Sequence, residues 1–127
     1  MTQPLTKSKD RVKQLGEVFT PPELVNEMLD RLPQELWSDP TKTYIDPACG
    51  TGNFLIEVVR RKIEAGSAPL QALETTYGID IMEDNVRECR QRMLDAAGNP
   101  PGGDRVVARR VKQADALKAN LDELFAD

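Results

Sequence analysis

A glycine loop between a strand and a helix limits the fold of this chain more than any other feature. The run YIDPACGTGNFL, residues 44–55, has a short β-type stretch that ends in Asp46, then the loop, then an apolar helical pattern. Gly66 stands where a glycine that ends such a helix is expected. The apolar positions with helical spacing are Phe54, Leu55, Val58, Val59 and Ile63. Strand, glycine turn and helix in this order are typical of a cofactor site.

Three strand candidates end near acidic residues. The runs TKTYID and YGID end at Asp46 and Asp80, and RVVARRVKQADAL has room for a third strand that ends near Asp115. Helical patterns separate these runs, and the alternation predicts a right-handed βαβαβ unit with a parallel sheet. We therefore expect an α/β fold with the three acids in register at the carboxyl ends of the strands, where ligands bind in such sheets.

Three further helices are expected. Thr20 and the residues after it, TPPE, predict a capping box that starts a helix over about residues 21–32. Its apolar face would consist of Leu24, Val25, Met28, Leu29 and Leu32. A short helix is expected over residues 67–75, and a longer one after Met82 that Gly98 ends. The longer helix carries an apolar stripe, which more often belongs to the core than to a cofactor site: Met82, Val86, Cys89 and Met93.

Chain length and charge narrow the class of protein. The chain has 127 residues, which is enough for one domain with a single core. Its net charge of -4 excludes a protein that coats nucleic acid with its whole surface, so any such contact must be local. We interpret residues 1–15 as a flexible basic arm, most often a solvated terminus, ahead of a cofactor-binding domain over residues 16–127.

The residue types present exclude several kinds of chemistry. The chain has no histidine, which excludes catalysis by histidine. Cys49 and Cys89 have neither metal-ligand spacing nor a disulfide framework, which favours a reducing compartment. No apolar run approaches the ~18 residues of a membrane helix, and the N-terminus lacks the core of a signal peptide. We expect a soluble, cytoplasmic protein with no metal site and no membrane partner.

Charge indicates which ligand the loop would take. The loop is only G-x-G, a weak signal by itself, and each aspartate alone could be a helix cap or a turn residue. Asp80 is placed to accept hydrogen bonds from ribose hydroxyls, although it follows Gly52 by more than the usual ~20 residues because of the short helix between them. Asp46, directly before the loop, would repel a phosphate and attract an ammonium group. The ligand that joins adenosine to an amino-acid ammonium is S-adenosylmethionine, whose sulfonium adds a second positive charge.

Several motifs together resemble a known family. GEVFTP, DPACGTGNFL, YGIDI and ADAL, over about residues 14–118, resemble the N-terminal, S-adenosylmethionine-binding part of the N6-adenine DNA methyltransferases of restriction–modification systems. The resemblance implies a Rossmann-like S-adenosylmethionine-dependent methyltransferase fold, here with a truncated parallel sheet and flanking helices.

The resemblance also implies a role for each matching residue. The implied cofactor-binding residues are Phe19, Thr20, Pro21, Asp46, Ala48, Gly50, Gly52, Asp80, Ile81, Asp115, Ala116 and Leu117. The first three would lie against the methionine end, and the next four would form the loop around the amino-acid moiety. Asp80 would hold the ribose hydroxyls and Ile81 would pack on the adenine. Asp115 would accept from the adenine amino group, with the last two residues beside the ring.

The catalytic motif of that family is not found where it is expected. It consists of Asn or Asp, two prolines, and Tyr or Phe after a fourth strand; its polar groups accept from the target amino group, and its ring stacks on a flipped base. The run NPPG, residues 99–102, precedes the third strand and has Gly102 in place of the aromatic residue, so we interpret it as a turn. We assign no catalytic residue, and we expect that this chain alone does not methylate adenine.

Three hypotheses follow for the function. The first is a cofactor-binding module, a short protein or a fragment, that needs a partner or a further segment for methyl transfer and contacts DNA through that partner or the basic arm. Because a truncated sheet exposes an edge and an apolar face, this hypothesis favours a homodimer or a second methyltransferase or specificity chain. The second is a non-catalytic cofactor-binding or regulatory protein with the same fold. The third, a methyltransferase for small molecules or proteins, is disfavoured because GEVFTP is typical of the DNA-modifying group.

Overall fold

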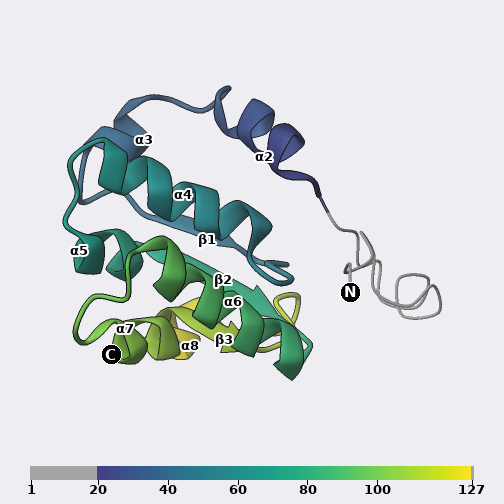
Figure 1. Cartoon of the computed structure of the whole chain (residues 1–127). Helices are drawn as coiled ribbons and strands as arrows, with labels where there is room; N and C mark the ends of the chain where they lie inside the picture. Colours follow the sequence, from purple (N-terminus) through teal and green to yellow (C-terminus); the bar gives the residue numbers. More distant parts are fainter. Residues whose placement is uncertain (1–19, 127) are drawn as a thin grey trace, which may run out of the picture.

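The computed structural model describes residues 20–126, and Figure 1 shows how strands and helices alternate along this part of the chain. Its elements in chain order are α2 (Pro22–Leu29), α3 (Glu35–Ser38), β1 (Tyr44–Asp46), α4 (Asn53–Glu64), α5 (Pro69–Glu74), β2 (Thr76–Asp80), α6 (Glu83–Ala96), α7 (Gly103–Arg110), β3 (Val111–Gln113) and α8 (Leu121–Leu124). The expected basic arm and Phe19 lie outside the described residues. None of the helices in residues 20–126 is long and apolar enough to span a membrane.

The strands form the parallel sheet that the sequence predicts. Their order is β1-β2-β3, and both neighbouring pairs are parallel, which confirms an α/β fold with a small parallel sheet and flanking helices. The register corrects one expectation. Asp46 pairs with Gly78 and Asp80 pairs with Gln113, so each aspartate lies two residues beyond the partner of the previous one rather than level with it. Because side chains alternate along a strand, this even stagger leaves Asp46 and Asp80 on the same face.

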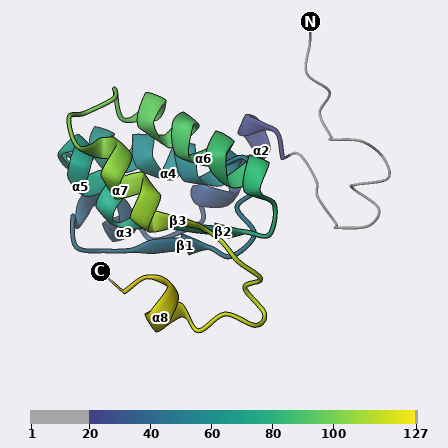
Figure 2. The same ribbon diagram turned by 90° about the horizontal axis from the view of Figure 1, so that it is seen from below.

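The helices cover mainly one face of the sheet. Figure 2 shows α4, α5, α6 and α7 on one side of the strands and α8 on the other. The main core lies between that face and the helices, with Leu55 and Val59 from α4 and Cys89 and Met93 from α6. A smaller cluster packs α2 and α3 against α4: Val25, Leu29, Trp37 and Val58.

The first helix starts and packs differently from the expectation. Its N-cap residue is Pro21, with Pro22 in the first turn and no side-chain cap hydrogen bond, so the capping box predicted from Thr20 is wrong. The helix also ends at Leu29, before the expected boundary. Only Val25 and Leu29 of the predicted apolar face are buried, because those two positions face α3 and α4.

Residues 99–113 confirm two expectations and add a helix that was not predicted. The run NPPG is a turn, with Asn99 at φ 52° and Gly102 at φ 83°. The third strand expected within residues 105–117 is present as β3, Val111–Gln113, and the residues before it form the helix α7. Valines suit a strand, but here Val106, Val107 and Arg110 are buried together at a spacing that one side of a helix provides.

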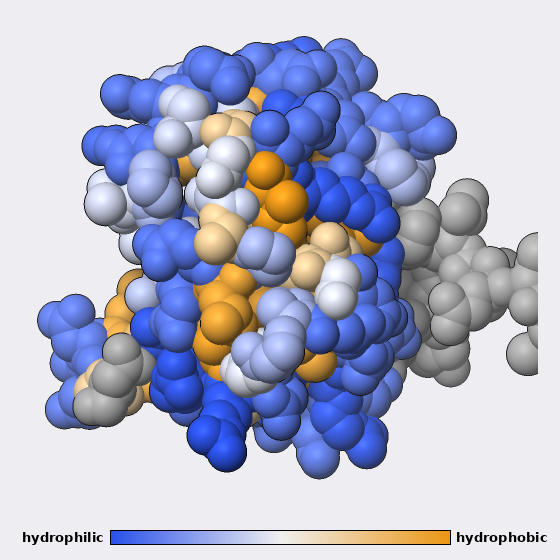
Figure 3. All heavy atoms as spheres, turned by 60° about the vertical axis from the view of Figure 1, so that its left-hand side comes forward, coloured by the Kyte–Doolittle hydropathy of each residue, from blue (hydrophilic) through white to orange (hydrophobic). Residues whose placement is uncertain are grey.

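Apolar surface remains exposed in several places. On the side of the molecule that carries α5, Figure 3 shows hydrophobic side chains reaching an otherwise hydrophilic surface. The exposed large apolar residues of the described part are Leu24, Met28, Leu32, Ile45, Leu70, Ile81, Leu117 and Leu121. Ile45 lies on β1, an edge strand of this sheet, and the sequence had predicted an open edge with an apolar face.

Candidate functional site

The glycine loop lies at the carboxyl end of the sheet, between β1 and α4. Its backbone is fixed to β2 by a hydrogen bond from Cys49 N to the Ile79 carbonyl at 2.8 Å, and it turns through a bond from Gly52 N to the Cys49 carbonyl at 2.9 Å. Gly52 has φ 94°, and a Cβ atom there would lie 2.9 Å from Cys89 Sγ. Glycine is therefore required at this position both for the turn and for the close approach of α6.

A second glycine, in β2, allows the loop and its helix to approach the sheet. A Cβ atom on Gly78 would lie 2.6 Å from Leu55 Cδ1 and 3.1 Å from Cys49 Sγ. Any larger residue would push the loop and the start of α4 away from the strand. Gly78 is not among the residues predicted from the sequence, although a glycine inside a strand pattern often marks such an approach.

Asp80 holds the loop in place. The residue is 9% exposed; its Oδ1 accepts from Gly50 N at 3.3 Å, and its Oδ2 accepts from Met82 N at 3.0 Å and from Asn85 Nδ2 at 2.9 Å. A carboxylate offers about four lone-pair sites, so these three donors leave it room to accept one more hydrogen bond. Asn85 is fully buried, and its role could not be predicted from the sequence because its contact depends on how α6 packs against β2.

Asp46 supplies a second carboxylate beside the loop. Its Oδ1 accepts from Ala48 N at 3.0 Å, which closes a tight turn at the start of the loop. Burial raises the pKa of Asp46, and the nearby charge of Asp80 raises it further, while the bond from Ala48 lowers it. Among residues 20–126, neither aspartate forms an ion pair. The loop is therefore flanked by two carboxylates that repel each other and have no cationic partner in the described part of the chain.

The segment after β3 joins the same edge of the sheet. Ala114 N donates to the Asp80 carbonyl at 3.0 Å, and Gln113 Nε2 donates to the Ile81 carbonyl at 3.2 Å. Asp115 closes its own turn, because its Oδ1 accepts from Leu117 N at 3.0 Å. Two apolar residues at this edge are exposed to solvent, Ile81 at 51% and Leu117 at 97%.

Thr20 and Pro21 lie at the start of α2. The Pro21 carbonyl accepts from Val25 N at 3.0 Å, which begins the helix. Figures 1 and 2 place this end of α2 on the same side of the molecule as the glycine loop. In residues 20–126 no hydrogen bond joins Thr20 or Pro21 to the loop, so their expected role at the methionine end of a cofactor stays a prediction.

The two cysteines meet beneath the loop. Cys49 and Cys89 are both buried and free; the Cys49 thiol donates to the Gly50 carbonyl at 3.7 Å, and the Cys89 thiol donates to Met93 Sδ at 3.8 Å. The neighbouring Cys89 thiol raises the pKa of the Cys49 thiol, and burial and the charges of Asp46 and Asp80 raise it further. A thiol held protonated in this way is a poor nucleophile, so Cys49 acts here as a packing residue. Residues 20–126 contain no group of side chains suited to bind a metal ion.

The arrangement suits a ligand with a positive charge at one end and an apolar ring at the other. The carboxylates favour a cation, the uncapped N-terminus of α4 offers backbone N–H groups, and the exposed apolar residues offer cover for a ring. The fold thus brings three groups of predicted residues to one edge of the sheet: the loop residues that include Ala48 and Gly50, the pair Asp80 and Ile81, and the segment 115–117.

The chain is similar to known proteins over most of its length. The family model for N-6 DNA methylase matches residues 5–96. The type II methyltransferase M.VspI of Vibrio sp. (strain 343) is 33% identical over 105 residues, which cover 83% of this chain and 21% of that protein. The chain thus spans about a fifth of the length of this curated relative, and no solved structure matches it. On the strength of the family match, the chain belongs to the N-6 DNA methylase family.

Proposed function

We propose that this chain is the S-adenosylmethionine-binding module of an adenine-specific (N6) DNA methyltransferase and has the Rossmann-like fold of such enzymes. The observation that carries the proposal is the pair of carboxylates, Asp46 and Asp80, which flank the glycine loop with no ion-pair partner in residues 20–126. A cofactor that carries an ammonium and a sulfonium group would supply the missing positive charge. A phosphate-bearing cofactor would be repelled by the same two groups.

Each part of the site has a role in this proposal. Asp46 faces the ammonium group, while Ala48, Gly50 and Gly52 shape the loop around the amino-acid moiety. Asp80 uses its remaining acceptor capacity for a ribose hydroxyl, in addition to its three internal donors. Burial of Ile81 and Leu117 against the adenine ring would remove from water two side chains that are now exposed.

The edge of the adenine is the remaining part of the ligand. Asp115 would accept from the adenine amino group, with Ala116 beside the ring. Its Oδ1 accepts from Leu117 N, which orients the carboxylate and leaves Oδ2 available as an acceptor. Thr20, Pro21 and Phe19 would close the methionine end from the side of α2.

Methyl transfer would need more than this site. The only asparagine followed by two prolines, Asn99, lies in the turn before α7, where Gly102 serves as the N-cap and no aromatic side chain is available to stack on a base. We therefore propose that a further segment or a partner chain supplies the catalytic motif and most of the contact with DNA. The open edge at β1 would be the place for a homodimer contact or a second methyltransferase or specificity chain.

A non-catalytic cofactor-binding or regulatory role is the second candidate. The observation that favours it is the structural use of the NPPG run, which leaves residues 20–126 without an assigned acceptor for the target amino group. Both candidates predict a soluble, cytoplasmic protein that binds the cofactor. They differ in whether a partner restores methyl transfer.

Two measurements test the proposal. In titration calorimetry, the purified chain should bind S-adenosylmethionine and S-adenosylhomocysteine; the absence of heat at millimolar cofactor would rule out the cofactor site. In an assay with labelled methyl groups and DNA, the chain alone should transfer none. Transfer that appears on addition of a chain with the Asn-Pro-Pro-Tyr type of motif favours the first candidate, and continued inactivity favours the regulatory one.

A further inference from the structure

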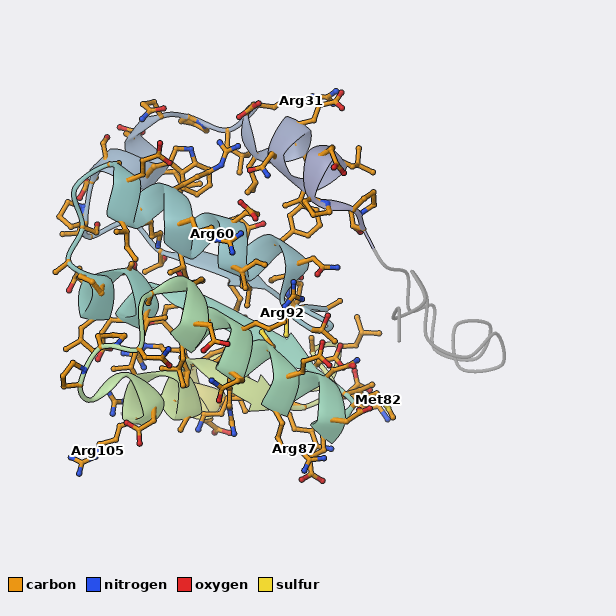
Figure 4. All side chains as sticks on the ribbon, in the orientation of Figure 1. Arg31, Arg60, Met82, Arg87, Arg92 and Arg105 are labelled. Atoms are coloured by element: carbon orange, nitrogen blue, oxygen red, sulfur yellow. The ribbon has the colours of Figure 1, made fainter. Side chains whose placement is uncertain are left out.

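The glycine loop is also held from α6, by an arginine that is not among the residues predicted from the sequence. Arg92 Nη1 donates to the Thr51 carbonyl at 2.9 Å, to Thr51 Oγ1 at 3.1 Å and to Asn53 Oδ1 at 2.7 Å. Figure 4 shows the Arg92 side chain reaching from α6 toward the N-terminal part of α4. One guanidinium nitrogen thus joins the loop and the first residue of the helix to a separate element of the fold.

The three acceptors lie on both sides of the residue at which the loop turns. Thr51 precedes and Asn53 follows Gly52, which adopts the left-handed conformation with φ 94° directly before α4. The bond to the Thr51 carbonyl fixes the peptide plane that also contains Gly52 N, which donates to the Cys49 carbonyl. Arg92 therefore fixes the orientation of the peptide that closes the loop.

Helix stability alone does not account for an arginine at this position. A positive charge next to the N-terminus of a helix is disfavoured by the helix dipole, and a serine or aspartate cap would stabilise that terminus better. Every hydrogen-bond acceptor of Arg92 in residues 20–126 is a neutral oxygen, so no ion pair offsets this cost. The contact of Arg92 with Thr51 and Asn53 therefore destabilises the start of α4 but fixes the loop. Such a contact is expected where the geometry of a loop matters for function.

We propose that Arg92 is a positioning residue, which holds Thr51 and Asn53 so that the glycine loop keeps the shape that receives the amino-acid end of the cofactor. This inference rests on the proposed function. It assigns Arg92 to the methionine end of the ligand, because Thr51 and Asn53 lie in the loop and at the start of α4, whereas the residues proposed for the adenine follow β2 and β3.

The test compares two ligands and three variants. Calorimetry with S-adenosylhomocysteine and with adenosine, which lacks the amino-acid moiety, is done on the wild type, Arg92→Ala, Arg92→Lys and Arg87→Ala. Arg87 is an exposed arginine on the same helix and serves as the matched control. Arg92→Ala should bind S-adenosylhomocysteine about tenfold more weakly, the effect of one or two lost hydrogen bonds, and adenosine within about twofold of the wild type. Arg92→Lys should recover part of the loss, and Arg87→Ala should match the wild type.

Equal weakening of both ligands in Arg92→Ala, or no weakening, would overturn the inference. A second readout separates it from the proposed function: amide hydrogen exchange of residues 50–53 in the free protein should be faster in Arg92→Ala and unchanged in Arg87→Ala. If the wild type binds neither ligand, the cofactor site is wrong, and the exchange experiment still decides whether Arg92 holds the loop. Exchange that stays the same in Arg92→Ala would show that it does not.

Discussion

Charged side chains at the two ends of the sheet differ in whether neighbouring residues compensate their charge. At the amino end, Lys62 is 2% exposed, and its ammonium donates to the Lys42 carbonyl at 3.1 Å, the Thr75 carbonyl at 2.9 Å and Thr75 Oγ1 at 2.7 Å. At the carboxyl end, Asp46 and Asp80 stand beside the glycine loop with backbone and amide donors but no cation in residues 20–126. The cation is enclosed by its acceptors, whereas the carboxylates keep a charge that the described residues leave uncompensated.

This difference indicates that the charge of Lys62 serves the structure, whereas the charge of Asp46 is suited to binding a ligand. Lys62 joins the segment before β1 to the end of α5, and its three acceptors use all three N–H groups of the ammonium. Its removal should therefore affect folding and leave ligand specificity unchanged. Burial disfavours the charged form of both groups, but Asp46 differs in its contacts, because its Oδ1 accepts from Ala48 N and the like charge of Asp80 lies nearby. Its removal should affect ligand binding and leave folding intact.

The largest effect is expected at the structural end. Lys62→Ala removes a buried side chain with its three hydrogen bonds and should lower the free energy of unfolding by about 2–4 kcal/mol. Lys118→Ala, at an exposed lysine, is the control and should change little. Urea denaturation followed by circular dichroism measures both. Similar stability for the two variants would show that Lys62 is not a structural connection.

For Asp80 we expect a loss of both stability and ligand binding, because this residue holds the loop and is also proposed to bind the cofactor. Asp80→Ala leaves the donors of Gly50, Met82 and Asn85 without their acceptor, so the free energy of unfolding should fall by about 1–3 kcal/mol. Binding of S-adenosylhomocysteine should weaken by roughly 1.5–3 kcal/mol, the usual loss for hydrogen bonds to a charged acceptor. Denaturation and calorimetry on the same preparation check the two parts. A loss of stability with full binding would restrict Asp80 to holding the loop.

A smaller effect should appear in the pH dependence of stability. Burial lowers the pKa of Lys62 from 10.5 to about 8, so between these values the unfolded chain holds a proton that the folded protein has released. The free energy of unfolding should therefore rise with pH through this window, by about 1.5 kcal/mol between pH 8 and 9.5. Lys62→Met should not show this rise. The window ends below pH 10 because burial raises the pKa of Tyr44, whose ionisation then opposes folding.

The smallest effect on folding is expected at Asp46. Asparagine keeps an oxygen that can accept from Ala48 N but has no charge, so it relieves the burial and the repulsion by Asp80. Asp46→Asn should therefore have a slightly higher melting temperature than the wild type in the absence of ligand. Thermal unfolding at neutral pH measures it. A lower melting temperature would mean that the carboxylate is a structural cap, and the contrast with Lys62 would fail.

Local signals in the sequence predict the elements closest to the site. The glycine loop and the helical spacing after it predict β1 and α4, and Gly66 and Gly98 both adopt the positive φ expected where a helix ends. The helix α7 before β3 was not predicted, because valines fit a strand and a buried helix equally well and packing decides between them.

The candidate site likewise contains residues whose position local sequence predicts and residues whose contacts depend on packing. Asp46, Asp80 and the loop glycines can be predicted because their position relative to strand ends is a property of the local sequence. Asn85 and Arg92 cannot, because what they contact depends on the rotation of α6 against β2 and α4. The stagger of the aspartates likewise could not be predicted, because it follows from the register in which neighbouring strands pair, and the sequence of one strand does not determine that register.

The most direct test of the account is calorimetry of the wild type and Asp46→Asn with S-adenosylhomocysteine and with adenosine. If Asp46 recognises the ammonium group, Asp46→Asn should bind S-adenosylhomocysteine about tenfold more weakly or worse, in line with the loss of a charged hydrogen-bond partner, and adenosine almost as the wild type does. An equal loss for both ligands, or no binding of S-adenosylhomocysteine by the wild type at millimolar concentration, would contradict the claim that the two carboxylates await a cationic cofactor.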